Sequence, residues 1–125
     1  MTALASARLH LAKAREFLDA AEASQELELY NEATASAVVS GINSKDAICL
    51  ALVGRSNKND NHEAARSELK AAGPAGRTLE PVLGRLLRLK TRAQYQDTSV
   101  SPADAKKAVE WATRLYEGAQ GAVRG

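Results

Sequence analysis

The sequence is poor in the residues that build disulfide frameworks, zinc sites and β-sheets. It has one cysteine and two histidines in 125 residues, so neither a disulfide nor a Cys/His zinc site can form within the chain. Aromatic residues make up only 4% of the chain, and alanine supplies much of its apolar content. This composition favours helices over strands. We therefore expect an all-α fold, with no metal and no cofactor.

The sequence also lacks a strong charge of either sign and any long apolar run. Lys and Arg number 17 against 15 Asp and Glu, a formal net charge of +2, so no global field marks a nucleic-acid binder. No apolar stretch is long enough to span a membrane. The first residues are basic and have no apolar segment of the kind a signal peptide carries. We expect a cytoplasmic protein with no membrane attachment, in which Cys49 is reduced and buried.

Apolar residues recur at helical spacing along the chain, and turn-forming residues separate these segments. The length suits a single domain over residues 1–125. We predict a bundle of four long helices plus one short helix, in an up-down arrangement. The expected helices cover residues 3–24, 27–53 and a short stretch from Asp60 to Ala72, then a fourth after a break at 73–76 and a fifth from Ser101.

Several residues predict where helices begin and end. The stretch Asp60-Asn61-His62-Glu63 has the spacing of a capping box, with Asp60 as N-cap. Ser101 is a good N-cap before Pro102. Gly54 is well placed to end the second helix. Pro81 suits the first turn of the fourth helix and is hard to place further in.

Arg55 and His62 bracket the polar loop between the second and third predicted helices. Residues 55–61 include no apolar side chain, and a tight loop between antiparallel helices would bring both residues to one end of the bundle. The N-terminus of the third helix attracts anions. Arg55 offers a bidentate partner for a phosphate, and His62 can give or take a proton near neutral pH.

Arg55, six intervening residues and His62 resemble the R-x4-6-H motif of HEPN domains, which lies between the second and third helices of a four- or five-helix bundle. Residues 31–49 are similar to the long second helix of that family. Residues 92–95, Arg-Ala-Gln-Tyr, are similar to its RxADY stretch, although Gln94 stands where many relatives carry an acid. Together these segments are spread over residues 31–95.

The resemblance implies a metal-independent endoribonuclease that cleaves RNA through attack by a ribose 2′-hydroxyl. Arg55 would hold the phosphate and His62 would act as general base or acid. Family members commonly form homodimers in which two motifs share one cleft, and many are toxins paired with an antitoxin such as a minimal nucleotidyltransferase. The supporting polar candidates are Asp46, Asn57, Asn59 and Asp60.

Other interpretations of the same residues stay open. Arg55 and His62 could simply satisfy backbone groups at helix ends, Asp60 could be only a cap, and Asp46 could be a solvated helix position. The chain could also be a HEPN-like module that binds a nucleotide or a protein without catalysis, or a bundle that mediates assembly. Catalysis requires Arg55 and His62 in one solvent-open cleft, whereas binding requires only Arg55 and the helix terminus.

The fourth helix is rich in basic residues that could contact RNA phosphates, although a solvated charged face is the commoner explanation. Tyr95 and Trp111 could stack on bases, but aromatic residues more often pack inside a bundle. We interpret His10 as a surface residue of the first helix. The basic residues in question are Arg77, Arg85, Arg88, Lys90 and Arg92.

Overall fold

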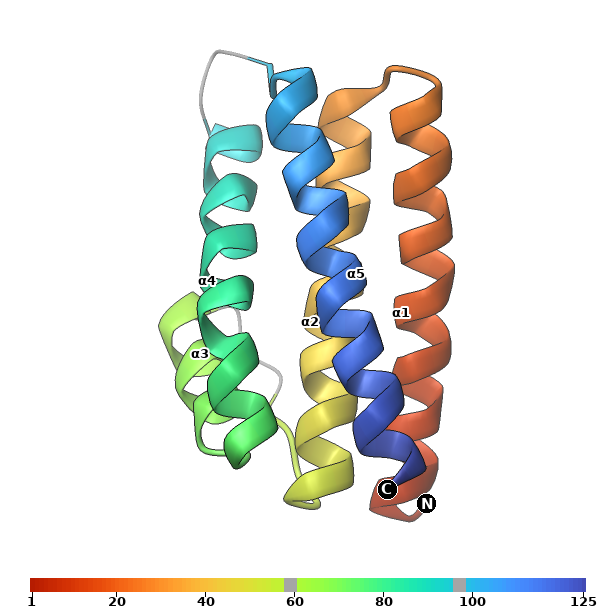
Figure 1. The fold of residues 1–125 in the computed structure, drawn as a ribbon, viewed down its shortest axis with the longest axis vertical. Coiled ribbons are helices and arrows are strands. Elements are labelled where there is room, and N and C mark those ends of the chain that lie inside the picture. The colour runs from red at the N-terminus through yellow and green to blue at the C-terminus, as the bar shows by residue number, and fades with distance from the viewer. Residues whose placement is uncertain (58–60, 96–98) are drawn as a thin grey trace.

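The structure, a computed structural model, describes residues 1–57, 61–95 and 99–125, with only the backbone of 92–95. Within these residues the chain forms five α-helices and no strand (Figure 1). The long helices alternate in direction, and the two chain ends lie at the same end of the bundle (Figure 1). The helices are α1 (Ala3–Glu26), α2 (Tyr30–Leu52), α3 (His62–Lys70), α4 (Pro74–Tyr95) and α5 (Pro102–Arg124). The predicted all-α bundle of four long helices and one short helix is confirmed.

Two helix ends lie where the sequence predicts them. Gly54 has φ +87°, which favours glycine, and its N–H donates to the carbonyl of Cys49 at 3.1 Å. Ser101 caps α5, because its Oγ accepts a hydrogen bond of 3.1 Å from the N–H of Asp104. Pro102 then occupies the first position of α5. These residues end α2 and begin α5 as expected.

The N-cap of α3 is Asn61, so the predicted cap at Asp60 is wrong by one residue. The side-chain oxygen of Asn61 accepts hydrogen bonds from the N–H groups of Glu63, at 2.9 Å, and Ala64, at 3.2 Å. His62 is therefore the first residue of the helix. Asn and Asp are equally good N-caps, and adjacent candidates cannot be ranked from sequence. Asp60 itself lies outside the described residues.

The start of α4 also differs from the prediction. The helix begins at Pro74, whereas a break was predicted over residues 73–76. The break between α3 and α4 is therefore limited to residues 71–73, and it includes Gly73 with φ +98°. Pro81 consequently lies inside the helix, where we did not expect a proline. It is tolerated because it is exposed, so water can reach the carbonyl that lacks its intrahelical donor. Gly76 lies in the first turn, where a Cβ would collide with the carbonyl of Leu69.

The hydrophobic core is centred on α2, which packs mainly against α1 and α5. Gly41 of α2 allows this close packing, because a Cβ there would lie 2.5 Å from Leu86 Cδ2 and 3.2 Å from Leu115 Cδ1. No helix in the described part of the chain is long and apolar enough to cross a membrane. The largest core side chains are Leu18, Val38, Ile48, Leu69, Leu83, Leu86, Leu87 and Leu115.

Candidate functional site

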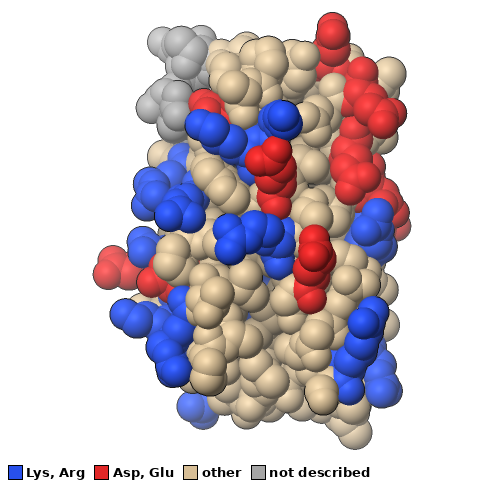
Figure 2. All heavy atoms as spheres, in the orientation of Figure 1, with Lys and Arg blue, Asp and Glu red and all other residues tan. Residues whose placement is uncertain are grey.

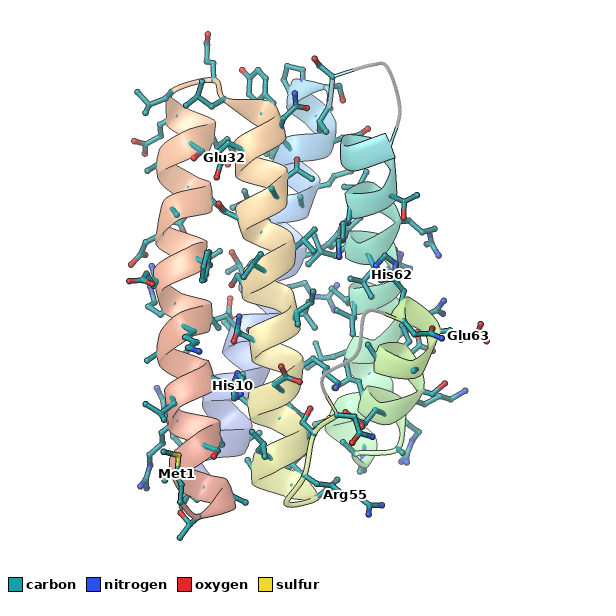
Figure 3. All side chains as sticks on the ribbon, turned by 180° about the vertical axis from the view of Figure 1, so that it is seen from behind. Met1, His10, Glu32, Arg55, His62 and Glu63 are labelled. Atoms are coloured by element: carbon teal, nitrogen blue, oxygen red, sulfur yellow. The ribbon has the colours of Figure 1, made fainter. Side chains whose placement is uncertain are left out.

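A groove of about 590 Å³ is lined by residues of α1, α2, α3 and α4. Figure 3 views the bundle from behind and shows α2 between α1 on one side and α3 on the other. The α1 residues His10, Lys13 and Phe17 share one helix face, because they are spaced i, i+3 and i+7. We refer to this hollow as the α2 groove.

The other side of the α2 groove carries a second lysine and a histidine. Lys90 of α4 lies on the same helix face as Leu83 and Leu87, at spacings of seven and three residues, and all three line the groove. His62 and Ala65 line it from the first turn of α3. The groove thus has an apolar lining with basic side chains contributed by α1 and α4.

Beneath the groove lies a buried polar network centred on Lys45. Lys45 and Asp46 are only 2% and 5% exposed. Lys45 Nζ donates to Asp46 Oδ1 at 3.3 Å and to Ser56 Oγ at 2.9 Å, and it also pairs with Glu68 of α3. Ser56 Oγ in turn donates to Asp46 Oδ1 at 2.5 Å. Buried charges need such partners, so this network fastens the chain after α2 to both α2 and α3.

Glu68 is the α3 member of this network. Its two carboxylate oxygens accept hydrogen bonds from the backbone N–H of Asn57, at 3.0 and 3.1 Å. Burial opposes ionisation of Glu68, but hydrogen bonds from Lys45 and from the Asn57 backbone outweigh it, and they hold the pKa of Glu68 below its usual value. Glu68 therefore carries a negative charge that fixes the position of Asn57.

His10, interpreted from the sequence as a surface or helix-face residue, also lines the α2 groove. It is partly buried, and its Nδ1 lies 2.8 Å from the side-chain oxygen of Asn43 and 3.9 Å from Asp46 Oδ2. Asn43 is held in turn, because its amide donates to the carbonyl of Val39 at 3.0 Å. This arrangement orients the imidazole ring at the edge of the groove.

Arg55 and His62 line different hollows in the described part of the structure. Arg55 is exposed and lines a separate hollow of about 180 Å³, together with Cys49 and Glu68. His62 lines the α2 groove, and of the described residues Asn57 alone lines both hollows. In Figure 3, Arg55 lies at the end of α2 and points away from the bundle, whereas His62 lies at the start of α3. The sequence-based expectation that the loop joins them in one place is not met in the single chain.

The supporting candidates have different outcomes. Asp46 is buried and bonded to Ser56, so it is not a solvated helix position. Asn57 contributes its backbone N–H to Glu68. Asn59 and Asp60 lie outside the described residues.

The basic residues of α4 do not form one uniform face. Arg77, Arg85 and Arg88 are exposed, whereas Lys90 is partly buried and lines the α2 groove. Figure 2 shows basic side chains over α4 and acidic side chains over the C-terminal half of α1. Trp111 packs against the hydrophobic core, which supports a structural role. The side chains of Arg92 and Tyr95 lie outside the described part of the structure.

Sequence analysis missed Lys13, Phe17, Lys45 and Glu68. A signal for Lys45 was present, because Lys45 and Asp46 are adjacent charged residues directly before the apolar run 47–53. The spacing of His10, Lys13 and Phe17 on one helix face was a signal too, but only the structure shows which neighbours leave that face open.

Cys49 is buried, as predicted. Burial raises the pKa of its thiol to about 11. A thiol with such a pKa is almost entirely protonated at neutral pH and is a poor nucleophile. In the described residues no group of three or more His, Cys, Asp and Glu side chains is arranged to hold a metal ion.

No protein-family model matches the chain, and a search of curated proteins finds no match. The HEPN resemblance therefore depends on the residues of this sequence alone.

Proposed function

We propose that the protein is a HEPN-like, metal-independent endoribonuclease in which His62 transfers a proton during cleavage. The observation that carries the proposal is the position of His62 on the α2 groove, which Lys13 and Lys90 also line. An RNA strand needs positive charge for its phosphates, and its cleavage needs a group that titrates near neutral pH. The lysines can supply the positive charge and His62 can supply the proton-transferring group, and all three side chains line one groove.

The reaction is an internal transesterification. A general base removes the proton of a ribose 2′-hydroxyl, and the 2′-oxygen attacks the adjacent phosphorus. The bond from phosphorus to the 5′-oxygen breaks, and that oxygen takes up a proton to leave as a hydroxyl. The products are a 2′,3′-cyclic phosphate and a 5′-hydroxyl end. His62 serves as the base or as the acid, and a guanidinium stabilises the charge on the phosphate.

In this proposal the guanidinium is Arg55 of a second copy of the chain. Arg55 is exposed, and no hydrogen bond or ion pair to it is formed among the described residues. It is therefore able to reach a phosphate held next to His62 of a partner in a homodimer. A toxin inhibited by an antitoxin, such as a minimal nucleotidyltransferase, is the biological setting that the HEPN resemblance implies.

A second candidate function is a HEPN-like module that binds a nucleotide or a protein partner without catalysis. It is favoured by the separation of Arg55 and His62, which line different hollows within one chain. Under this alternative, the lysines of the groove bind a ligand and neither Arg55 nor His62 performs chemistry.

The experiment that separates the two functions is RNA cleavage by the wild type, Arg55→Ala, His62→Ala and the control Ser67→Ala. Ser67 is an exposed residue of α3 and lines neither hollow. Ribonuclease function predicts cleavage by the wild type and the control, and at least a hundredfold loss in the other two variants, as for removal of one group that stabilises a transition state. Equal cleavage by all four proteins, or cleavage by none, would favour the binding module.

A mixture of the two inactive variants tests the shared site. In a mixed dimer each copy lacks one group, so one cleft lacks both groups and the other cleft is intact. Mixing Arg55→Ala with His62→Ala should therefore restore part of the activity. If both variants are inactive and the mixture stays inactive while the chains exchange, Arg55 does not act across a dimer.

A further inference from the structure

The α2 groove contains an aromatic side chain next to basic ones. Phe17 is the only phenylalanine of the chain, and it lines the groove and is partly exposed. Aromatic side chains at such positions stack on nucleobases, because every base has a flat face. Ile42 and Leu87 add apolar surface from the neighbouring helices.

The charges of the groove favour a ligand with a phosphate group. Lys45 pairs with Asp46, at 3.3 Å, and with Glu68, which does not line the groove, so this lysine is already neutralised. Of the remaining charged residues, Lys13 and Lys90 outnumber Glu16. Lysine binds phosphate as a point charge, and Lys13 and Lys90 line the same groove as Phe17 from two different helices.

Polar groups between these two positions can recognise a base or a sugar. The Nδ1 atom of His10 is hydrogen-bonded to the side-chain oxygen of Asn43, so a ligand would bind to the other ring nitrogen, Nε2. The groove volume of about 590 Å³ lies within the range of small-ligand sites. We propose that the α2 groove binds one nucleotide of single-stranded RNA, with the base on Phe17 and the phosphate at Lys13 and Lys90. The choice of RNA rests on the proposed function, but the nucleotide site does not.

A second copy of the chain is a poorer occupant of this groove. A two-fold dimer places the same surface of each copy against the other. A dimer that filled one groove with the other would bring Lys13 and Lys90 of both copies into one interface, and like charges in an interface are unfavourable. A nucleotide instead supplies the negative charge that these lysines need.

Binding is measured by NMR titration of the full chain with 5′-AMP, adenosine and inorganic phosphate, in the presence of chelator. The amide signals of groove residues should shift with 5′-AMP and shift much less with adenosine or phosphate alone. A 2′-O-methyl oligonucleotide, which the proposed reaction cannot cleave, tests the source of the nucleotide. If the oligonucleotide binds more tightly than 5′-AMP, the groove is assigned to an RNA strand. Tighter binding of 5′-AMP would overturn the RNA assignment in favour of a free nucleotide.

Two variants and a matched control test the residues. Phe17→Ala and the double variant Lys13→Ala/Lys90→Ala should each weaken 5′-AMP binding about tenfold or more, which corresponds to the loss of one stacking or charged contact. The control is Arg8→Ala/Arg85→Ala, which removes two exposed cations from the same helices outside the groove. Circular dichroism checks that each variant is folded.

The outcomes separate this inference from the ribonuclease proposal. Absence of binding in the wild type, or equal weakening by the control, overturns the nucleotide site. If the wild type is a dimer and the Lys13→Ala/Lys90→Ala variant is a monomer, the groove is assigned to a second copy instead. Nucleotide binding without RNA cleavage keeps the site and overturns the ribonuclease. RNA cleavage that is unchanged in the Phe17 and lysine variants keeps the ribonuclease and overturns the site.

Discussion

The backbone N–H of Asn57 donates hydrogen bonds to both carboxylate oxygens of Glu68, at 3.0 and 3.1 Å. Lys45 of α2 pairs with the same carboxylate. Its Nζ also donates a hydrogen bond to Ser56 Oγ at 2.9 Å, which fixes the position of the lysine side chain. The segment that follows Arg55 is thereby held against α3. This contact keeps Arg55 at the end of α2 while His62 faces the α2 groove.

Replacing Glu68 with Gln should destabilise the protein. Gln keeps the size of the side chain but removes the charge that partners the buried Lys45. We expect a loss of about 1–3 kcal/mol in the free energy of unfolding, measured by urea denaturation. The control is Glu63→Gln, because Glu63 is exposed on the same helix. Equal stability of the two variants would show that the network contributes little.

The same carboxylate should make stability depend on pH. The pKa of Glu68 is lowered in the folded state relative to an ordinary value of 4.5, so the folded state favours the carboxylate. The stabilisation is therefore fully present above the unfolded pKa and is lost as the pH falls through the folded pKa. We expect the free energy of unfolding to fall more steeply below about pH 5 in the wild type than in Glu68→Gln. Parallel pH profiles would contradict this role.

The Cys49 thiol should be inert in the folded protein. Its pKa is raised to about 11 because the side chain is buried, and the reactive form of cysteine is the thiolate. We expect slow reaction with a thiol-specific reagent at pH 8 and rapid reaction once urea unfolds the chain. Rapid labelling under native conditions would mean that α2 opens readily around Cys49.

Two glycines inside helices should respond in opposite ways to alanine. At Gly41 a Cβ would lie 2.5 Å from the buried Leu86 side chain, whereas at Gly121 nothing lies within 4 Å. Gly41→Ala should destabilise the protein by about 1–3 kcal/mol through overpacking. Gly121→Ala should stabilise it by roughly 0.5–1 kcal/mol through helix propensity. Thermal denaturation of both variants checks the contrast, and stabilisation by both would contradict the packing described for Gly41.

Local signals predicted the fold well. Gly54 and the Ser101-Pro102 pair mark helix ends through their own backbone preferences, which act whatever the rest of the chain does. The prediction was wrong for Pro81, because a position inside a helix is acceptable when it is exposed. Solvent exposure is a property of the packed bundle and is not written in the local sequence.

The candidate site was predicted less completely. The segment between α2 and α3 was located correctly, but among the described residues Arg55 and His62 line different hollows. The contact between Asn57 and Glu68, whose partners are 11 residues apart in sequence, holds the segment after Arg55 against α3. His10 belongs to the site only because α2 places Asn43 beside it. Such long-range contacts leave no periodic pattern in a sequence.

The most direct test of the proposed function is cleavage of a labelled oligoribonucleotide in the presence of chelator, compared with the same oligonucleotide carrying 2′-O-methyl groups. We expect the wild type to cut the ribonucleotide, to produce 2′,3′-cyclic phosphate ends and to leave the methylated strand intact. The His62→Ala variant should cut neither strand. Cleavage of the methylated strand, cleavage that requires a metal ion, or no cleavage at all would contradict the ribonuclease proposal.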